Sequence, residues 1–163
     1  MSHLIEQLET VMRELLAEQQ AMLTSLDAQL ASLRTFQIDL INNATREQET
    51  SRQRLARIEQ RRKYVIAQIM RTHRNLSKPT LTKIAELYPE RKLFLLQLRD
   101  ELANVLAQIQ QRTNLINKIV GGVLSHLNGT VRLIAQAASG PSTYSKSGNM
   151  NSPSKTGILS AVG

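Results

Sequence analysis

The chain has 163 residues, of which 41% are hydrophobic and 3% aromatic, and it has no cysteine. This length allows one domain with a modest core of aliphatic side chains, and the absence of cysteine excludes disulfides, thiolate metal sites and a cysteine nucleophile. The net charge of +8 is spread unevenly: residues 1–45 hold two basic and six acidic side chains, whereas residues 46–78 hold ten basic and three acidic ones. We therefore expect neighbouring helices of opposite charge.

The first predicted helix covers residues 2–42. Apolar side chains recur along it every three or four residues, which is the spacing of one helix face. This stripe consists of Leu4, Leu8, Val11, Leu15, Met22, Leu26, Leu30, Leu33, Gln37 and Leu40. The pattern falters at Asn42-Asn43, and the segment Thr45 to Gln48 has the form of a capping box. We predict a second helix from residue 45 that runs antiparallel to the first, because the loop between them is short.

The second predicted helix covers residues 45–76, with Leu55, Ile58, Val65, Ile69 and Leu76 on its apolar stripe and Arg62 in the place of an apolar residue. A short helix follows over residues 80–88. Pro89-Glu90 suits the start of a last helix, over residues 90–138. Residues 139–163 are rich in Ser, Gly, Pro, Asn and Thr, and predict a flexible tail. The expected fold is an all-α, elongated antiparallel bundle of three long helices and one short one, with residues 1–138 as its folded part.

The last predicted helix carries an unusual amount of apolar surface. Up to Ile109 its apolar side chains fall within an arc of about 100°, which suits one core, but past Asn114 the arc widens to about 180°. Gly121, Gly122 and Gly129 project to the polar side, and each costs about 0.5–1 kcal/mol relative to alanine inside a helix. A wide apolar face on a weak helix favours a site that orders as it binds a partner segment, and a homodimer seam is the main alternative.

Signals for other functions are weak. The three histidines lie far apart in the sequence, and no metal-binding, phosphate-binding or nucleophile motif accompanies them, so we expect no enzyme, no metal and no cofactor. Basic residues between Arg52 and Lys63 could contact phosphates, but pairing with Glu6, Glu9, Glu14 or Glu18 across the hairpin explains them without a nucleic acid. The longest apolar run, Leu93 to Leu96, is too short for a membrane span, and no signal peptide is evident.

Four segments, taken in order and spacing, resemble the FlgN-type flagellar export chaperones. They are LAEQQAML (residues 16–23), RLARIEQRR (54–62), TNLINKIV (113–120) and TYSKSG (143–148). The resemblance implies a cytoplasmic protein that binds hook-associated proteins of the hook–filament junction, prevents their premature assembly and helps deliver them to the flagellar type III export apparatus. It also implies that the client-binding region lies in the C-terminal helix and tail.

The segment that the resemblance implies is the one that the helical periodicity selects. The expected partner-binding residues are Asn114, Ile119, Val120, Val123, Leu124, Leu127, Val131, Ile134 and Tyr144. We expect hook-associated proteins as partners, with the export apparatus as a further one, and neither nucleic acid nor stable membrane insertion. The alternatives are a structural coiled-coil homodimer, a basic helical protein that binds nucleic acid, and a helix that lies on a membrane surface.

Overall fold

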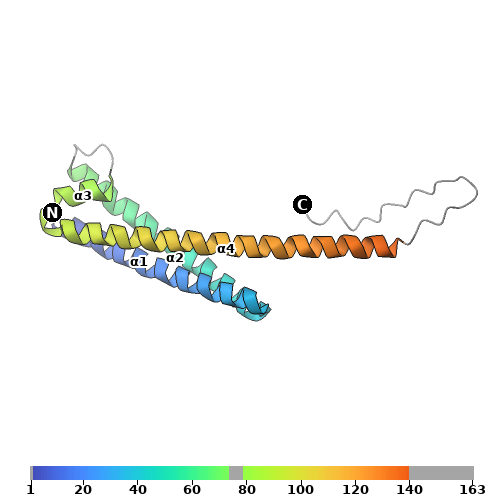
Figure 1. Cartoon of the computed structure of the whole chain (residues 1–163). Helices are drawn as coiled ribbons and strands as arrows, with labels where there is room; N and C mark the ends of the chain where they lie inside the picture. Colours follow the sequence, from blue (N-terminus) through green and yellow to red (C-terminus); the bar gives the residue numbers. More distant parts are fainter. Residues whose placement is uncertain (1, 74–78, 140–163) are drawn as a thin grey trace, which may run out of the picture. The chain divides into compact units, whose positions relative to one another are not determined.

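The computed structural model describes residues 2–73 and 79–139, and all its regular elements there are helices (Figure 1). Three are long, namely α1 (Ser2–Thr35), α2 (Ile38–Thr72) and α4 (Lys92–Ala138), and α3 (Leu81–Leu87) is short. A 3-10 turn, η1 (Pro89–Arg91), leads into α4. The predicted all-α fold of three long helices and one short helix is confirmed. Two compact units make up the chain, Met1–Val123 and Leu124–Gly163.

The turn between α1 and α2 lies seven residues earlier than the sequence predicts. α1 ends at Thr35 and α2 begins at Ile38, so the predicted boundary at residues 42–45 is wrong. Thr45 lies inside α2, where its hydroxyl donates to the Ile41 carbonyl oxygen at 2.9 Å. The capping-box pattern at this position is therefore not used as a cap.

The chain turns at Phe36, which has a φ of 52°, in the left-handed region. The Phe36 N–H donates to the Leu33 carbonyl at 3.4 Å and the Gln37 N–H donates to the Ser32 carbonyl at 3.1 Å. These two bonds form a Schellman motif, which satisfies the last carbonyls of a helix and usually has glycine at the left-handed position. A phenylalanine there gives no sequence signal for a turn, which explains the misplaced boundary.

The main core of the first unit joins all four helices at the end where α1 begins. Leu8, Ile69, Ile84 and Leu95 are completely buried, and they come from α1, α2, α3 and α4 in turn. α3 begins with Thr80, whose side chain caps the Lys83 N–H. α3 thus adds Ile84 and Ala85 to a core that the three long helices also share.

α1 and α2 run antiparallel, as the pairs between them show. The Ser25 hydroxyl donates to the Ala44 carbonyl at 3.1 Å, so small residues let the two backbones approach closely near the turn. Further along, Arg54 pairs with Glu18 and Arg61 pairs with Glu14. The predicted pairing of the basic run with acids of the first helix is confirmed at these two pairs, whereas Glu9 pairs with Arg91 of η1 instead.

Arg62 stands at a position of the apolar stripe of α2, where it forms an ion pair with Glu59 of the same helix. Its Nε donates to Glu59 Oε2 at 2.8 Å, and a second bond joins the two side chains. Both side chains are about one-third exposed. This hydrogen bonding lowers the pKa of Glu59 below its ordinary value and raises the pKa of Arg62. The charge therefore stays paired at a half-buried position.

Residues at the ends of the predicted elements fall partly outside the described ranges. α2 ends at Thr72 with His73 as its C-cap, and residues 74–76 of the predicted second helix lie outside the described residues. The same holds for the predicted flexible tail beyond Ser139. The short helix and the last helix occur close to where the sequence predicts them, at Leu81–Leu87 and Lys92–Ala138.

Candidate partner-binding surface

Within the first unit, α4 packs parallel to α1. Arg91, just before α4, pairs with Glu9 at 3.6 Å, and Arg112 pairs with Asp27 at 2.7 Å. The second pair sets an offset of 85 residues, so the end of α1 at Thr35 is level with about Val120 of α4. Packing of α4 on α1 therefore reaches Ile116, which is buried, and Ile119, which is half-buried against the same cluster.

The predicted partner-binding residues of the first unit differ in exposure. Val120 is 38% exposed and Val123 is half-buried. Asn114 is exposed and its side-chain oxygen accepts a hydrogen bond from Gln110 at 2.9 Å. Tyr144 lies outside the described residues.

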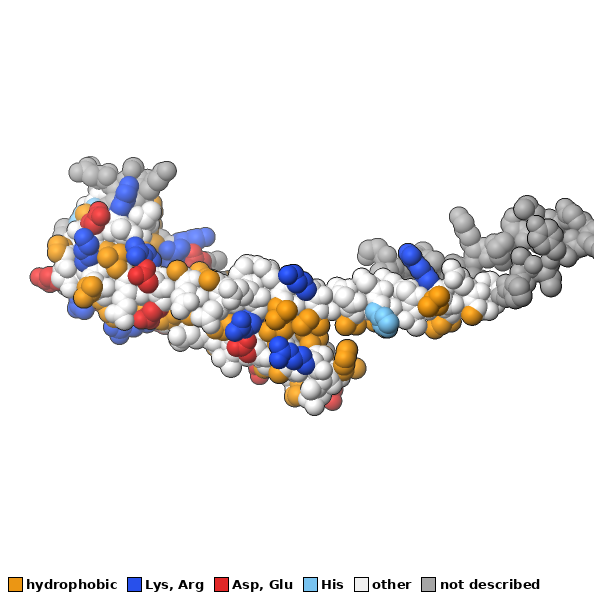
Figure 2. All heavy atoms as spheres, viewed as in Figure 1, with side chains coloured by type: hydrophobic (Ala, Val, Ile, Leu, Met, Phe, Trp, Pro, Cys, Tyr) orange, Lys and Arg blue, Asp and Glu red, His pale blue; other side chains and the backbone are white. Residues whose placement is uncertain are grey.

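In the second unit, four of the predicted residues form an exposed apolar face on α4. Leu124, Leu127, Val131 and Ile134 are 55%, 53%, 62% and 63% exposed. Their spacing of three, four and three residues places them on one side of a helix. We call these four residues the C-terminal apolar face. Figure 2 shows hydrophobic side chains at the surface along this part of the chain.

α4 continues through all three glycines that interrupt this segment. A Cβ built on Gly121, Gly122 or Gly129 would meet nothing within 4 Å. The glycines are therefore not required for close packing or for an unusual backbone conformation. Their effect is to weaken the helix, because glycine loses more backbone freedom on ordering than alanine does.

The charges around the C-terminal apolar face are all of one sign. Glu101 is the last acidic residue in the sequence, and Lys118, His126 and Arg132 lie on the helical segment after it. Backbone carbonyls of this segment receive extra hydrogen bonds, for instance from the Thr130 hydroxyl to His126 at 3.0 Å. A binding partner would meet an apolar stripe beside basic side chains, on a part of α4 that has no carboxylate after Glu101.

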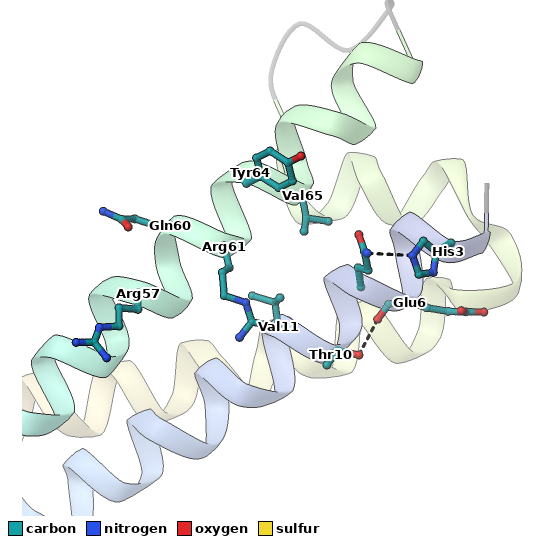
Figure 3. Close-up of a pocket in the computed structure, with 10 residues that line it drawn as sticks. His3, Glu6, Thr10, Val11, Arg57, Gln60, Arg61, Tyr64 and Val65 are labelled. Atoms are coloured by element: carbon teal, nitrogen blue, oxygen red, sulfur yellow. Dashed lines mark hydrogen bonds between the residues drawn. The ribbon is translucent and has the colours of Figure 1, made fainter.

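The basic run of α2 borders a hollow of about 790 Å³ between α1 and α2, shown in Figure 3. Arg57, Arg61 and Tyr64 line one side of it, and His3 and Glu6 line the other. In the close-up Gln60 projects away from α1, whereas Arg61 points toward it, where its guanidinium pairs with Glu14. The mixed charge of this hollow, with one of its arginines already paired, makes it a poor phosphate site.

The histidines do not come together in the described structure. His3 hydrogen-bonds Gln7 within α1 at 3.0 Å, and His73 lies 3.4 Å from the Tyr88 hydroxyl oxygen. His126 is exposed on α4. These positions agree with the interpretation of exposed or locally hydrogen-bonded histidines.

Comparison with protein families decides which kind of helical protein this is. The family model described as FlgN protein matches residues 1–152. The chain belongs to the FlgN family. This match confirms the family resemblance inferred from the sequence. FlgN proteins are a family of flagellar export chaperones and not a family of enzymes. No curated protein and no solved structure matches the chain. Among the described helices of this FlgN protein, none has both the length and the apolar character that crossing a bilayer requires.

Sequence reasoning missed a second apolar surface, a groove in the first unit between α1, α2 and α4. One signal for it exists in the sequence. The apolar stripe of α1 skips a step between Leu15 and Met22, where Glu18 and Gln19 stand. A polar residue at a core position of a helix indicates a place where packing is incomplete.

Proposed function

We propose that this FlgN protein is a cytoplasmic chaperone that binds a hook-associated protein of the hook–filament junction through its C-terminal apolar face. The observation that carries the proposal is the exposure of Leu124, Leu127, Val131 and Ile134 on one side of the part of α4 that follows the last acidic residue, Glu101. Contiguous exposed apolar surface in a soluble chaperone usually serves binding. An amphipathic client helix would lay its own apolar side against this face.

The face supplies a large part of the binding free energy of a reversible complex. Full burial of one leucine or valine contributes about 1.5–3 kcal/mol, so four residues supply roughly 6–12 kcal/mol before the cost of association. A micromolar complex requires about 8 kcal/mol net, which additional rim contacts must supplement. Lys118 and Arg132 would favour acidic side chains at the edge of the client helix.

Chaperoning by this face requires no chemical reaction. A client whose terminal helix is bound cannot use that helix to assemble, so binding lowers the concentration of assembly-competent client by mass action. The glycines keep the segment adaptable and limit its affinity, because part of the binding energy is used to order the helix. A complex of moderate affinity can then release its client at the export apparatus.

The test is a calorimetric titration that measures the affinity of the full-length chain for a hook-associated protein of the same organism. Leu124→Asp and Leu127→Asp should abolish binding while the far-ultraviolet helical signal stays nearly unchanged, because both side chains are more than half exposed. Ser125→Asp and Asn128→Asp are matched controls, since they add the same charge to the polar side of the same segment and should bind normally.

Two results would contradict the proposal. Variants at Leu124 and Leu127 that bind the client as tightly as the unmodified chain would show that this face is not the binding site. A doubled mass in light scattering that Leu127→Asp returns to a monomer would make the face a dimer seam instead.

A further inference from the structure

The three-helix groove is the hollow of about 380 Å³ that α1, α2 and α4 enclose in the first unit. Its walls are residues 19–29 of α1, 45–55 of α2 and 106–117 of α4. Each wall is ten or eleven residue steps long, which corresponds to about 16 Å, or three turns of a helix. The three walls of matching length form a groove long enough to take one face of a further helix of about three turns.

The floor of the groove is apolar. Met22 and Leu26 of α1 and Ile116 of α4 are less than 10% exposed and form its base. Leu55 and Ile109 are half-buried on the two sides, and Leu106 is 50% exposed at the lip. An amphipathic helix placed here would bury the apolar surface that the three helices still expose in the groove.

The polar contacts at the groove join α2 to α1 and α4 to α1. Gln48 of α2 donates to Gln29 of α1 at 2.6 Å, and Arg112 of α4 pairs with Asp27 of α1. Over the described residues, no hydrogen bond or ion pair joins α2 to α4. At the other end of the unit, α3 supplies Ile84 and Ala85 to the core. At the groove, no described element supplies core residues in the way that α3 does at the other end.

One buried polar atom in the groove has no partner. Gln19 is 7% exposed and lines the groove, and its side-chain oxygen makes no hydrogen bond in the described structure. A buried acceptor without a donor destabilises a fold, because it has lost its hydrogen bonds to water without gaining others. A helix that brought a side-chain amide, hydroxyl or ammonium group to this point would satisfy it.

The charge of the lining indicates the character of that helix. Arg52 is the only ionisable residue among those that line the groove; it pairs with Glu49 of its own helix at 3.4 Å and is otherwise exposed, and the other polar lining residues are amides and threonines. The lining residues of α4 also recur every three or four positions, a spacing that continues in the sequence through Val120 and Leu124. The groove and the C-terminal apolar face therefore present similar chemistry: apolar, with basic and amide edges.

We propose that the three-helix groove binds a second amphipathic helix of the same flagellar client, about three turns long, which presents a carboxylate toward Arg52 and a hydrogen-bond donor toward Gln19. This inference rests on the proposed function, because it takes the client as given and adds a second contact. A client held at two sites dissociates more slowly than one held at either site alone. Docking at the groove would also complete a four-helix arrangement in the first unit.

The experiment measures the affinity of the full-length chain for a hook-associated protein of the same organism. Leu106→Asp should weaken binding by about tenfold to a hundredfold, since it removes one buried leucine from the complex. Ala107→Asp is the matched control, because it adds the same charge one residue away on the exposed side of α4 and should bind normally. Arg52→Glu should weaken binding several-fold, whereas Arg57→Glu, on the same helix but outside the groove, should not.

A variant at Gln19 distinguishes an effect on client binding from an effect on the stability of the free chain. Gln19→Met removes the unpaired acceptor while nearly keeping the volume, so the free chain should resist urea better and yet bind the client more weakly. Tighter or unchanged binding would overturn the proposed contact. Client binding that survives Leu106→Asp and Arg52→Glu but is lost in Leu124→Asp would also overturn the groove proposal and leave the proposed function standing. No binding by the unmodified chain would overturn both.

Discussion

Replacing the three glycines of α4 with alanine should stabilise the proposed client-binding segment without disturbing any contact. Each glycine lies far from the ends of α4, and a Cβ at each position would meet nothing within 4 Å. The gain per substitution is then the difference in helix propensity alone, about 0.8–1 kcal/mol, and the triple variant Gly121→Ala, Gly122→Ala and Gly129→Ala gains roughly 2–3 kcal/mol. Few regions of a protein allow such a clean estimate, because added methyl groups usually meet neighbours.

Hydrogen exchange of the backbone amides between residues 119 and 138 is the direct assay. A gain of 2–3 kcal/mol in the local opening free energy corresponds to exchange that is slower by roughly 30- to 150-fold. Ala135→Gly, in the same exposed segment, should accelerate exchange by about fivefold and serves as the opposite control. Amides of the triple variant that exchange at the original rate would show that glycine does not limit helix order, and the account of this segment would be wrong.

The same variant tests the proposed mechanism of client release. A helix that is already ordered loses less conformational entropy when it binds, so the triple variant should bind the client more tightly and release it more slowly. Stopped-flow dissociation with excess competing client measures this rate. Faster release in a variant with slower amide exchange would separate helix order from client affinity and refute the link between them.

Three further predictions concern the bundle itself. Phe36→Gly should raise the free energy of unfolding in urea by about 1 kcal/mol, because the left-handed conformation is unfavourable for phenylalanine and its side chain is 71% exposed. Because the pKa of Glu59 is lowered in the folded chain, its carboxylate stabilises the fold above the unfolded-state pKa of 4.5, and this contribution is lost as the pH falls through the lowered pKa. The difference in unfolding free energy between the original chain and Glu59→Gln should therefore be present at neutral pH and vanish in acid. Ile84→Ala should cost about 2–5 kcal/mol, whereas Leu93→Ala, at a position that is 83% exposed, should change the unfolding free energy by less than about 0.5 kcal/mol.

Periodicity predicted the core of this FlgN protein well, because core packing is what periodicity reports. Leu8, Val11, Leu15, Met22, Leu26 and Leu30 of the predicted stripe are all buried. The turn was not predictable in the same way, since Phe36 takes the conformation that a sequence normally signals with glycine or asparagine.

That single misplaced turn also changes what can be inferred about α4. By the observed offset of 85 residues, α1 with its actual end at Thr35 is level with about Val120, near the end of the first unit. A prediction that placed this end at residue 42 could not give the stretch of α4 that packs on α1. The three-helix groove was missed for a related reason: it depends on the distance between α2 and α4, which no local pattern of residues reports.

The absence of acidic side chains beyond Glu101 has a practical consequence for the study of complexes. Over that stretch the sequence holds no carboxylate side chain and a single histidine, His126. The charge of α4 beyond Glu101 therefore has no contribution from carboxylates. After His126 has been replaced by glutamine, the remaining pH dependence of binding at this helix becomes a titration curve of the client's own acidic residues.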